Sequence, residues 1–118
     1  MTTLNPELVD HSPGQWDRYK WLGIVTNDTI VEVQIDALAA ELNFHIFGTF
    51  ANGTSVAING SNDGGTTFTA LTDGTGSVVA KLAAGIVSVR EQPLKVKPVV
   101  TDGSSDSIDV WLVIRYPK

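Results

Sequence analysis

The chain of 118 residues contains no cysteine, so neither a disulfide nor a thiolate-bound metal can hold it together. No segment approaches the ~20 consecutive apolar residues that a membrane-spanning helix needs. The first residues, MTTLNPELVDHSPG, lack both the basic region and the apolar run of a secretory signal. These absences predict a soluble protein made in the cytosol and are compatible with folding in a reducing compartment.

Basic side chains are also scarce. The 8 lysine and arginine residues stand against 13 acidic residues, which gives a formal net charge of −5. No basic cluster is denser than Lys95-Val-Lys97. Because binding to phosphates needs several aligned lysine or arginine side chains, we expect neither nucleic acid nor an anionic membrane surface as a partner.

Motifs that carry catalysis or metal binding are missing as well. The sequence has no HExxH, Walker loop, GxGxxG, EF-hand spacing or nucleophile elbow. Its two histidines are His11 and His45, and His45 lies in an expected strand on the face of Phe47, which favours a structural role. The acidic turns around residues 62–63 and 102–106 are explained by turn chemistry without calcium. We predict a protein that is not an enzyme, with no catalytic residue, metal or cofactor.

What the sequence does contain is a series of short strands. About seven or eight of them, separated by turns, predict an all-β domain over residues 16–118, an antiparallel β-sandwich or jelly roll with one possible helical turn at 36–42. The final strand, from Ile108 to Tyr116, alternates strictly without glycine or proline, so we place it in the middle of a sheet. Residues 1–15 show no periodicity, which indicates a flexible N-terminal arm that becomes ordered on binding.

The stretch from residue 48 to residue 76 carries the strongest turn signals. Asn52-Gly53 separates two apolar runs and suits a two-residue hairpin loop, in which both residues take positive φ. Such a loop would pair Phe47 with Ile58. A second turn has Asx and glycine residues that tolerate left-handed conformations. The predicted turn residues are Asn52, Gly53, Asn62, Asp63 and Gly64.

Both faces of the predicted hairpin carry large apolar groups, whereas a sheet with one wet face alternates more cleanly. One of these faces would therefore be covered, either by another chain or by the chain's own termini. The three tryptophans are suited to anchoring an interface or stacking on sugar rings, with core packing as the alternative. The interface candidates are Phe44, Ile46, Phe50, Trp16, Trp21 and Trp111.

From residue 44 onward, the chain resembles a group of small tailed-bacteriophage virion proteins. The similarity rests on the common spacing of GTF at 48–50, VAINGSNDG at 56–64, LTD at 71–73, EQP at 91–93 and VTDG at 100–103. A final apolar strand follows these motifs. Lys97 replaces the usual arginine before a proline, and Asp102 stands where glycine is common.

The resemblance implies a structural protein of the virion, of the head decoration or cement type, made in the host bacterial cytoplasm. Its partner would be the major capsid protein on the outside of the shell. Binding across a capsid symmetry axis implies a homo-oligomer, either a dimer or a trimer. An acidic chain suits the outer surface rather than a place against packaged DNA.

The SNDG turn also resembles a strand-turn-strand of discoidin-like carbohydrate-binding sandwiches. This second similarity supports the fold and says little about sugar. The alternative function is a carbohydrate- or receptor-binding module of a phage fibre or adhesin, with the tryptophans at 16, 21 and 111 as stacking residues.

Overall fold

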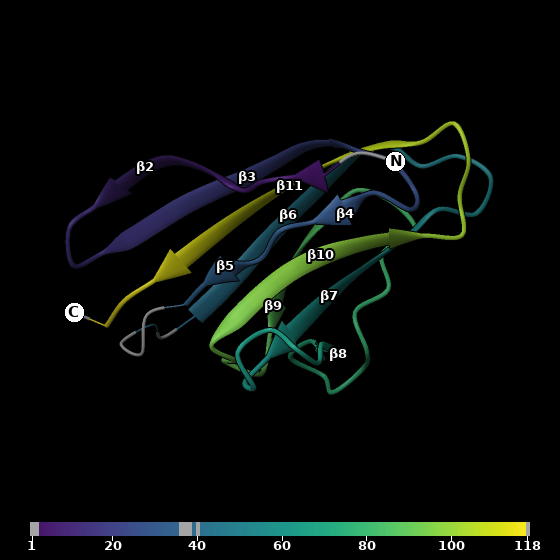
Figure 1. Cartoon of the computed structure of the whole chain (residues 1–118). Helices are drawn as coiled ribbons and strands as arrows, with labels where there is room; N and C mark the ends of the chain where they lie inside the picture. Colours follow the sequence, from purple (N-terminus) through teal and green to yellow (C-terminus); the bar gives the residue numbers. More distant parts are fainter. Residues whose placement is uncertain (1–2, 36–38, 40, 118) are drawn as a thin grey trace.

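The computed structural model describes residues 3–35, 39 and 41–117 (Figure 1). These residues form strands and turns, which confirms the prediction of an all-β protein with antiparallel sheets. They include no helix, and hence none long and apolar enough to cross a membrane. The helical turn expected at 36–42 lies largely outside the described residues.

Five antiparallel strands form the larger sheet. Its central strand is β11, as predicted from the uninterrupted alternation of that segment. In spatial order, the strands are β2 (Glu7–Ser12), β3 (Trp16–Ile24), β11 (Ser107–Arg115), β6 (Glu41–Thr49) and β9 (Gly85–Val89).

Four antiparallel strands form the second sheet, and two short parallel strands form a third. The second sheet has the order β5 (Val33–Gln34), β10 (Lys95–Thr101), β7 (Ser55–Ser61) and β8 (Thr69–Ala70). The third pairs β1 (Thr3–Leu4) with β4 (Thr29–Ile30). The described residues thus form eleven strands in three sheets, more than expected, partly because β1 and β2 arise within the predicted arm.

The two larger sheets face each other, and the side chains between them form the hydrophobic core (Figure 1). Alternate residues of β11, from Ile108 to Ile114, are at most 1% exposed. Val56 and Ile58 of β7, in the facing sheet, are completely buried as well. Strand alternation therefore leaves the intervening residues of β11 on the outer side of the larger sheet.

Asn52 and Gly53 form the predicted tight turn, but the hairpin predicted around it is wrong. Both residues have positive φ, 56° and 86°, and the amide of Thr54 donates to the carbonyl of Ala51 at 3.3 Å. However, β6 pairs with β11 and β9, while β7 pairs with β10 and β8. The turn therefore carries the chain from one sheet to the other.

The distribution of apolar residues explains why the two strands form an arch between the sheets, with β6 in one sheet and β7 in the other. In a hairpin, Phe44 and Ile46 would lie on the face opposite Val56 and Ile58, so one pair would be exposed. With the two strands in facing sheets, all four side chains are completely buried. Burial of apolar surface contributes about 25 cal/mol per Å². This gain favours the arch over the hairpin.

Three of the six interface candidates belong to the core instead, and a fourth packs against it. Phe44 and Ile46 are fully buried, Trp21 is 1% exposed, and Phe50 packs partly buried against the same core. The indole Nε1 of Trp21 donates to the carbonyl of Val31 at 2.9 Å, which satisfies its one polar group. Our expectation of an external contact is corrected for Phe44, Ile46 and Trp21, because the chain's own fold covers them.

The segment predicted to be a flexible arm takes part in the sheets. β2 pairs with β3 from Glu7 to Ser12, with one irregularity between Leu8 and Asp10, and β1 pairs with β4. Backbone hydrogen bonds hold an edge strand whatever its side-chain periodicity, so the sequence of this segment did not reveal it. The sheets therefore begin at Thr3.

Candidate functional site

The outer side of the larger sheet gathers aromatic and basic side chains from three neighbouring strands. The register places Trp111 of β11 between Lys20 of β3 and His45 of β6. Directly opposite residues share a face, and the alternate residues of β11 are buried, so these side chains point away from the core. We call this surface the aromatic face; it comprises Trp16, Arg18, Lys20, His45, Phe47 and Trp111.

Cations lie over the two indole rings of the aromatic face. The Arg18 guanidinium carbon lies 5.8 Å from the ring centroid of Trp16 and 5.3 Å from that of Trp111. The Lys20 ammonium lies 5.4 Å from the Trp111 ring. These distances fall within the range of cation–π attraction. The two indoles are consequently half-buried although they stand outside the core.

The edge strand β2 fixes the position of Arg18. Its Nε and Nη2 donate to the two carboxylate oxygens of Asp10 at 2.8 and 2.6 Å. The hydrogen bond to Asp10 raises the pKa of Arg18 more than partial burial lowers it. Because a bidentate pair fixes the plane of the guanidinium, the segment predicted to be an arm positions the centre of the aromatic face.

Trp111 has a hydrogen-bond donor without a partner. Its indole Nε1 is buried, and no described residue accepts a hydrogen bond from it. Such donors are rare in folded proteins. Nearby, an open hollow of about 160 Å³ is lined by Trp16, Arg18, Val113 and Arg115. The aromatic face thus offers cations, ring surface and a hollow to a partner.

Each of the two histidines contacts one neighbouring side chain. The His45 ring lies 4.8 Å from the Phe47 ring, which confirms that the two share a face. His11 Nδ1 lies 3.7 Å from a carboxylate oxygen of Asp17. No three histidine, cysteine or acidic residues in the described part of the chain are grouped so that they could hold a metal ion.

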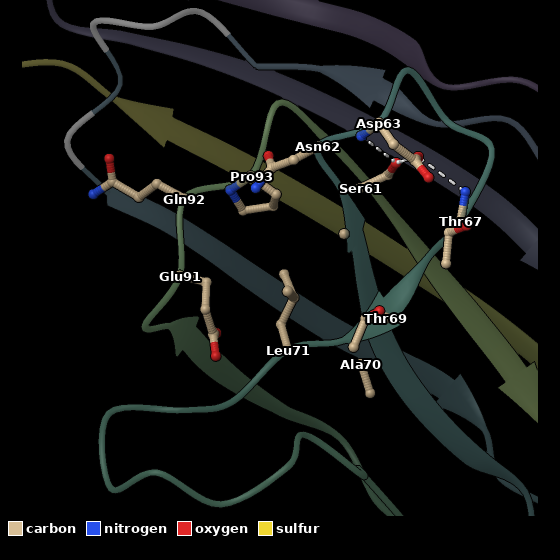
Figure 2. A pocket seen from close by; sticks show the side chains of 11 residues that line it. Ser61, Asn62, Asp63, Thr67, Thr69, Ala70, Leu71, Glu91, Gln92 and Pro93 are labelled. Carbon is tan, nitrogen blue, oxygen red and sulfur yellow. Dashed lines mark hydrogen bonds between the residues drawn. The ribbon is translucent and has the colours of Figure 1, made fainter.

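A larger hollow, of about 550 Å³, is lined by residues of the motifs that carry the phage resemblance (Figure 2). In Figure 2, the turn at Ser61–Asp63 lies on one side, and the Glu91–Pro93 segment lies on the other, with Leu71 between them. Pro93 packs closely on Gly60, where an added Cβ would lie 2.5 Å from the proline ring. The hollow is therefore the surface of a packed junction between motifs.

Asp63 organises the predicted second turn, which joins β7 to β8 as a hairpin, as expected. Its Oδ1 accepts hydrogen bonds from Ser61 Oγ at 2.7 Å and from the amides of Thr66 and Thr67 at 3.1 and 2.9 Å. These bonds, that of the Thr67 amide first, lower the pKa of Asp63 to about 2. Gly64 follows with a φ of 85°. The carboxylate thus holds its own turn.

Carboxylate hydrogen bonds also join the LTD motif to the EQP motif. The amide and hydroxyl of Thr72 donate to the two carboxylate oxygens of Glu91 at 2.9 and 2.7 Å and lower the pKa of Glu91. Asp73 accepts hydrogen bonds from the hydroxyl and amide of Thr75 at 2.7 and 2.9 Å, and these lower the pKa of Asp73. Asn62, which lies beside Asp63 in the preceding turn, accepts a hydrogen bond from the amide of Leu94 at 2.9 Å.

The VTDG motif lies beside a buried carboxylate that ties three loops together. Asp106, 6% exposed, accepts hydrogen bonds from the amide and hydroxyl of Thr26 at 3.1 and 2.6 Å and from the hydroxyl of Thr54 at 2.9 Å. Burial alone would raise the pKa of Asp106, but these hydrogen bonds lower it further than burial raises it. Gly103 has no room for a Cβ, because Thr54 and Asp106 lie against it. Asp102 takes a φ of 66°, a conformation in which glycine is favoured.

The motif residues therefore form turns, carboxylate hydrogen bonds and close packing contacts. These are structural roles, so the motifs are explained by the fold. The aromatic face lies outside these motifs, apart from the turns and contacts that they form. Of the six interface candidates, the structure brings together Trp16 and Trp111 there. The sequence did not reveal the neighbouring Asp10, because only the pairing of β2 with β3 brings it to Arg18.

Comparison of the chain with protein-family models, with curated proteins and with solved structures finds no match. Its function is therefore inferred from the chemistry of its own residues and from the spacing of its motifs.

Proposed function

We propose that this chain is a non-enzymatic head decoration or cement protein of a tailed bacteriophage, which binds the major capsid protein on the outside of the shell. The observation that carries the proposal is the aromatic face, with Trp16 and Trp111 beside Arg18 and Lys20. Tryptophan and arginine are the residue types enriched where proteins bind each other.

We further propose that eight of the strands form a jelly roll. The supporting observation is the strand order, β3-β11-β6-β9 in one sheet and β5-β10-β7-β8 in the other. The chain changes sheet at each step along β3, β5, β6 and β7. Viral capsid proteins and lectins both use this architecture, so the fold is compatible with both candidate functions and decides between neither.

Charge agrees with a place on the outside of the shell. The chain has a net charge of −5, which disfavours contact with packaged DNA. On this acidic chain, the aromatic face presents Arg18 and Lys20 at its centre. A decoration protein that binds the assembled lattice better than free subunits stabilises the shell by mass action.

Cosedimentation with phage heads that lack the protein tests this proposal. We expect saturable binding to expanded shells and none to immature shells. A double variant, Trp16→Ala with Trp111→Ala, should weaken binding by about 2 kcal/mol, roughly thirtyfold, as expected for anchor residues. Leu94→Ala is the matched control, because Leu94 is 51% exposed and lies next to the second sheet.

Two outcomes would contradict the proposal. Absence of binding to either kind of shell by the folded protein would remove the decoration function. Equal binding by the double variant and by Leu94→Ala would show that the aromatic face is not the contact surface. Thermal unfolding of each variant shows whether a loss of binding reflects a loss of fold.

The alternative is a carbohydrate- or receptor-binding module, and the indole of Trp16 in the wall of the 160 Å³ hollow favours it. Sugar rings stack on exposed indole faces. Tryptophan fluorescence titrated with glycans should shift for such a module and stay flat for a decoration protein. Trp21 would not contribute to stacking, because it is buried in the core.

A further inference from the structure

The hollow of about 160 Å³ at the margin of the aromatic face lies over β3 and β11. Its lining consists of two cross-strand pairs, Trp16 with Arg115 and Arg18 with Val113, which the register places side by side. All four side chains point away from the core, since they alternate with the residues that pack into it. Val113 is much shorter than its three neighbours, so the surface sinks above it. The hollow therefore has an aliphatic floor between an indole and two guanidinium groups.

The lining of the hollow carries two positive charges and no negative one, on a chain whose net charge is −5. Two acidic residues of the same outer side lie beyond it. Asp10 pairs with Arg18 from β2, and Glu41 lies opposite Arg115 on β6. Because the strand order is β2-β3-β11-β6, the hollow lies between these two carboxylates and contains neither. Its own charge therefore favours an anionic group.

Arg115 is the cation of the hollow that has no partner. Its side chain is exposed, and among the described residues its guanidinium makes no hydrogen bond, ion pair or ring contact. The carboxylate of Glu41, directly opposite, instead accepts a hydrogen bond from the hydroxyl of Ser88 at 3.2 Å. Arg18 differs, because Asp10 occupies two of its five N–H donors. The unpaired charge of the hollow is thus that of Arg115.

The size of the hollow suits a single side chain. Sites for small-molecule ligands generally have volumes of about 300–1,000 Å³, and this hollow is smaller. Nucleic acid needs several aligned cations, whereas one unpaired cation lines the hollow. A carboxylate accepts two parallel hydrogen bonds from one guanidinium, and the methylene groups of an acidic side chain can pack on an indole and a valine. An aspartate or glutamate side chain meets all of these conditions.

We propose that the hollow receives an aspartate or glutamate side chain of the major capsid protein, whose carboxylate pairs with Arg115 and whose methylene groups lie on Trp16 and Val113. The inference rests on the proposed decoration function and adds to it the chemistry of the partner's contacting group. The second guanidinium, that of Arg18, stays paired with Asp10 and forms the opposite wall.

Binding of charge variants to expanded phage heads that lack the protein tests this contact. Arg115→Gln should bind about tenfold more weakly than the wild type, and Arg115→Glu more weakly still, because two carboxylates would then face each other. Arg115→Lys keeps the charge without the planar fork and should fall between the wild type and Arg115→Gln. Lys97→Gln is the matched control, because it removes a positive charge from β10 in the second sheet, and it should bind like the wild type.

The failure of this contact can be told apart from the failure of the decoration function. If the wild type binds to no shell, the decoration function is contradicted. If the wild type binds and a folded Arg115→Gln variant binds equally well, the decoration function stands and the carboxylate contact is overturned. Added salt should weaken wild-type binding more than that of Arg115→Gln, since the variant lacks a charge that salt screens. Equal salt dependence of the two would also overturn the contact.

A fragment titration tests the hollow without shells. Butyrate carries a carboxylate on a short apolar stem, and butyramide has nearly the same shape without the charge. At constant ionic strength, millimolar butyrate should saturably shift the indole N–H NMR signal of Trp16, assigned with Trp16→Phe, and butyramide should not. The signal of Trp21, which is buried in the core, should not move. Arg115→Gln should weaken the binding of butyrate at least about fivefold. No saturable shift, or an equal one in the variant, would overturn the site whatever the result with shells.

Discussion

At the scale of single residues, Asp106 shows how one carboxylate can join several loops through hydrogen bonds. The sequence placed it in an acidic turn whose chemistry needed no calcium. In the structure, two threonines from other loops donate to it, and it is almost fully buried. Carboxylates at Asp63, Asp73 and Glu91 accept hydrogen bonds from nearby threonines in the same manner.

This arrangement predicts sensitivity to acid. A carboxyl group whose pKa is lowered by folding stabilises the protein above its ordinary pKa, about 4, and loses that contribution as the pH falls through the lowered value. We expect the free energy of unfolding to fall below about pH 4. Asp106→Asn should cost about 1–3 kcal/mol at neutral pH, since it leaves buried groups imperfectly paired, and should reduce the fall in acid.

Urea unfolding between neutral pH and pH 3 measures both effects. Glu7→Gln, which removes an exposed carboxylate of β2, serves as the control. An Asp106→Asn variant as stable as the wild type at neutral pH would show that the three-loop junction contributes little.

At the scale of the elements, the sequence predicted best the parts that depend on a single strand. β11 alternates apolar and polar side chains without interruption, and it lies at the centre of the larger sheet as expected. The turn at Asn52-Gly53 also formed as predicted. Its strands diverge because pairing depends on distant segments, and a local turn signal carries no information about β9, β10 or β11.

The candidate site was predictable only where it depends on a single strand. Alternation along β3 put Trp16, Arg18 and Lys20 on one face, and the structure agrees. Their neighbour Trp111 comes from a strand some ninety positions away, and only the register of β3 with β11 joins the two tryptophans on one surface. The same alternation puts Trp21 on the opposite face of β3, but the sequence did not show which of the two faces the second sheet covers.

The first strands give a prediction at this scale. Deleting residues 1–14 removes β2 and leaves β3 as an unprotected edge. We expect the free energy of unfolding to fall by roughly 2–4 kcal/mol, at about 1 kcal/mol for each lost ladder hydrogen bond. Denaturant unfolding measures the change, and Asp10→Ala, which breaks only the pair with Arg18, should have a smaller effect. Unchanged stability would support the original expectation of a flexible arm.

At the scale of the whole molecule, the larger sheet has two different sides. The aromatic face covers the outer side of β3, β11 and β6, while alternate side chains of the same strands pack into the core against the second sheet. A partner bound on the aromatic face would therefore leave the core between the two sheets unchanged.

The position of β11 in the chain also bears on how the protein is made. The strands on either side of it, β3 and β6, come much earlier in the sequence, yet each finds its main partner only in residues 107–115. During translation, both strands emerge with an unpaired edge and must wait until Arg115 has left the ribosome. Contacts of such wide sequence separation slow folding, and exposed edges in the meantime invite aggregation. The same strand that organises the finished core therefore sets the time at which the larger sheet can be completed.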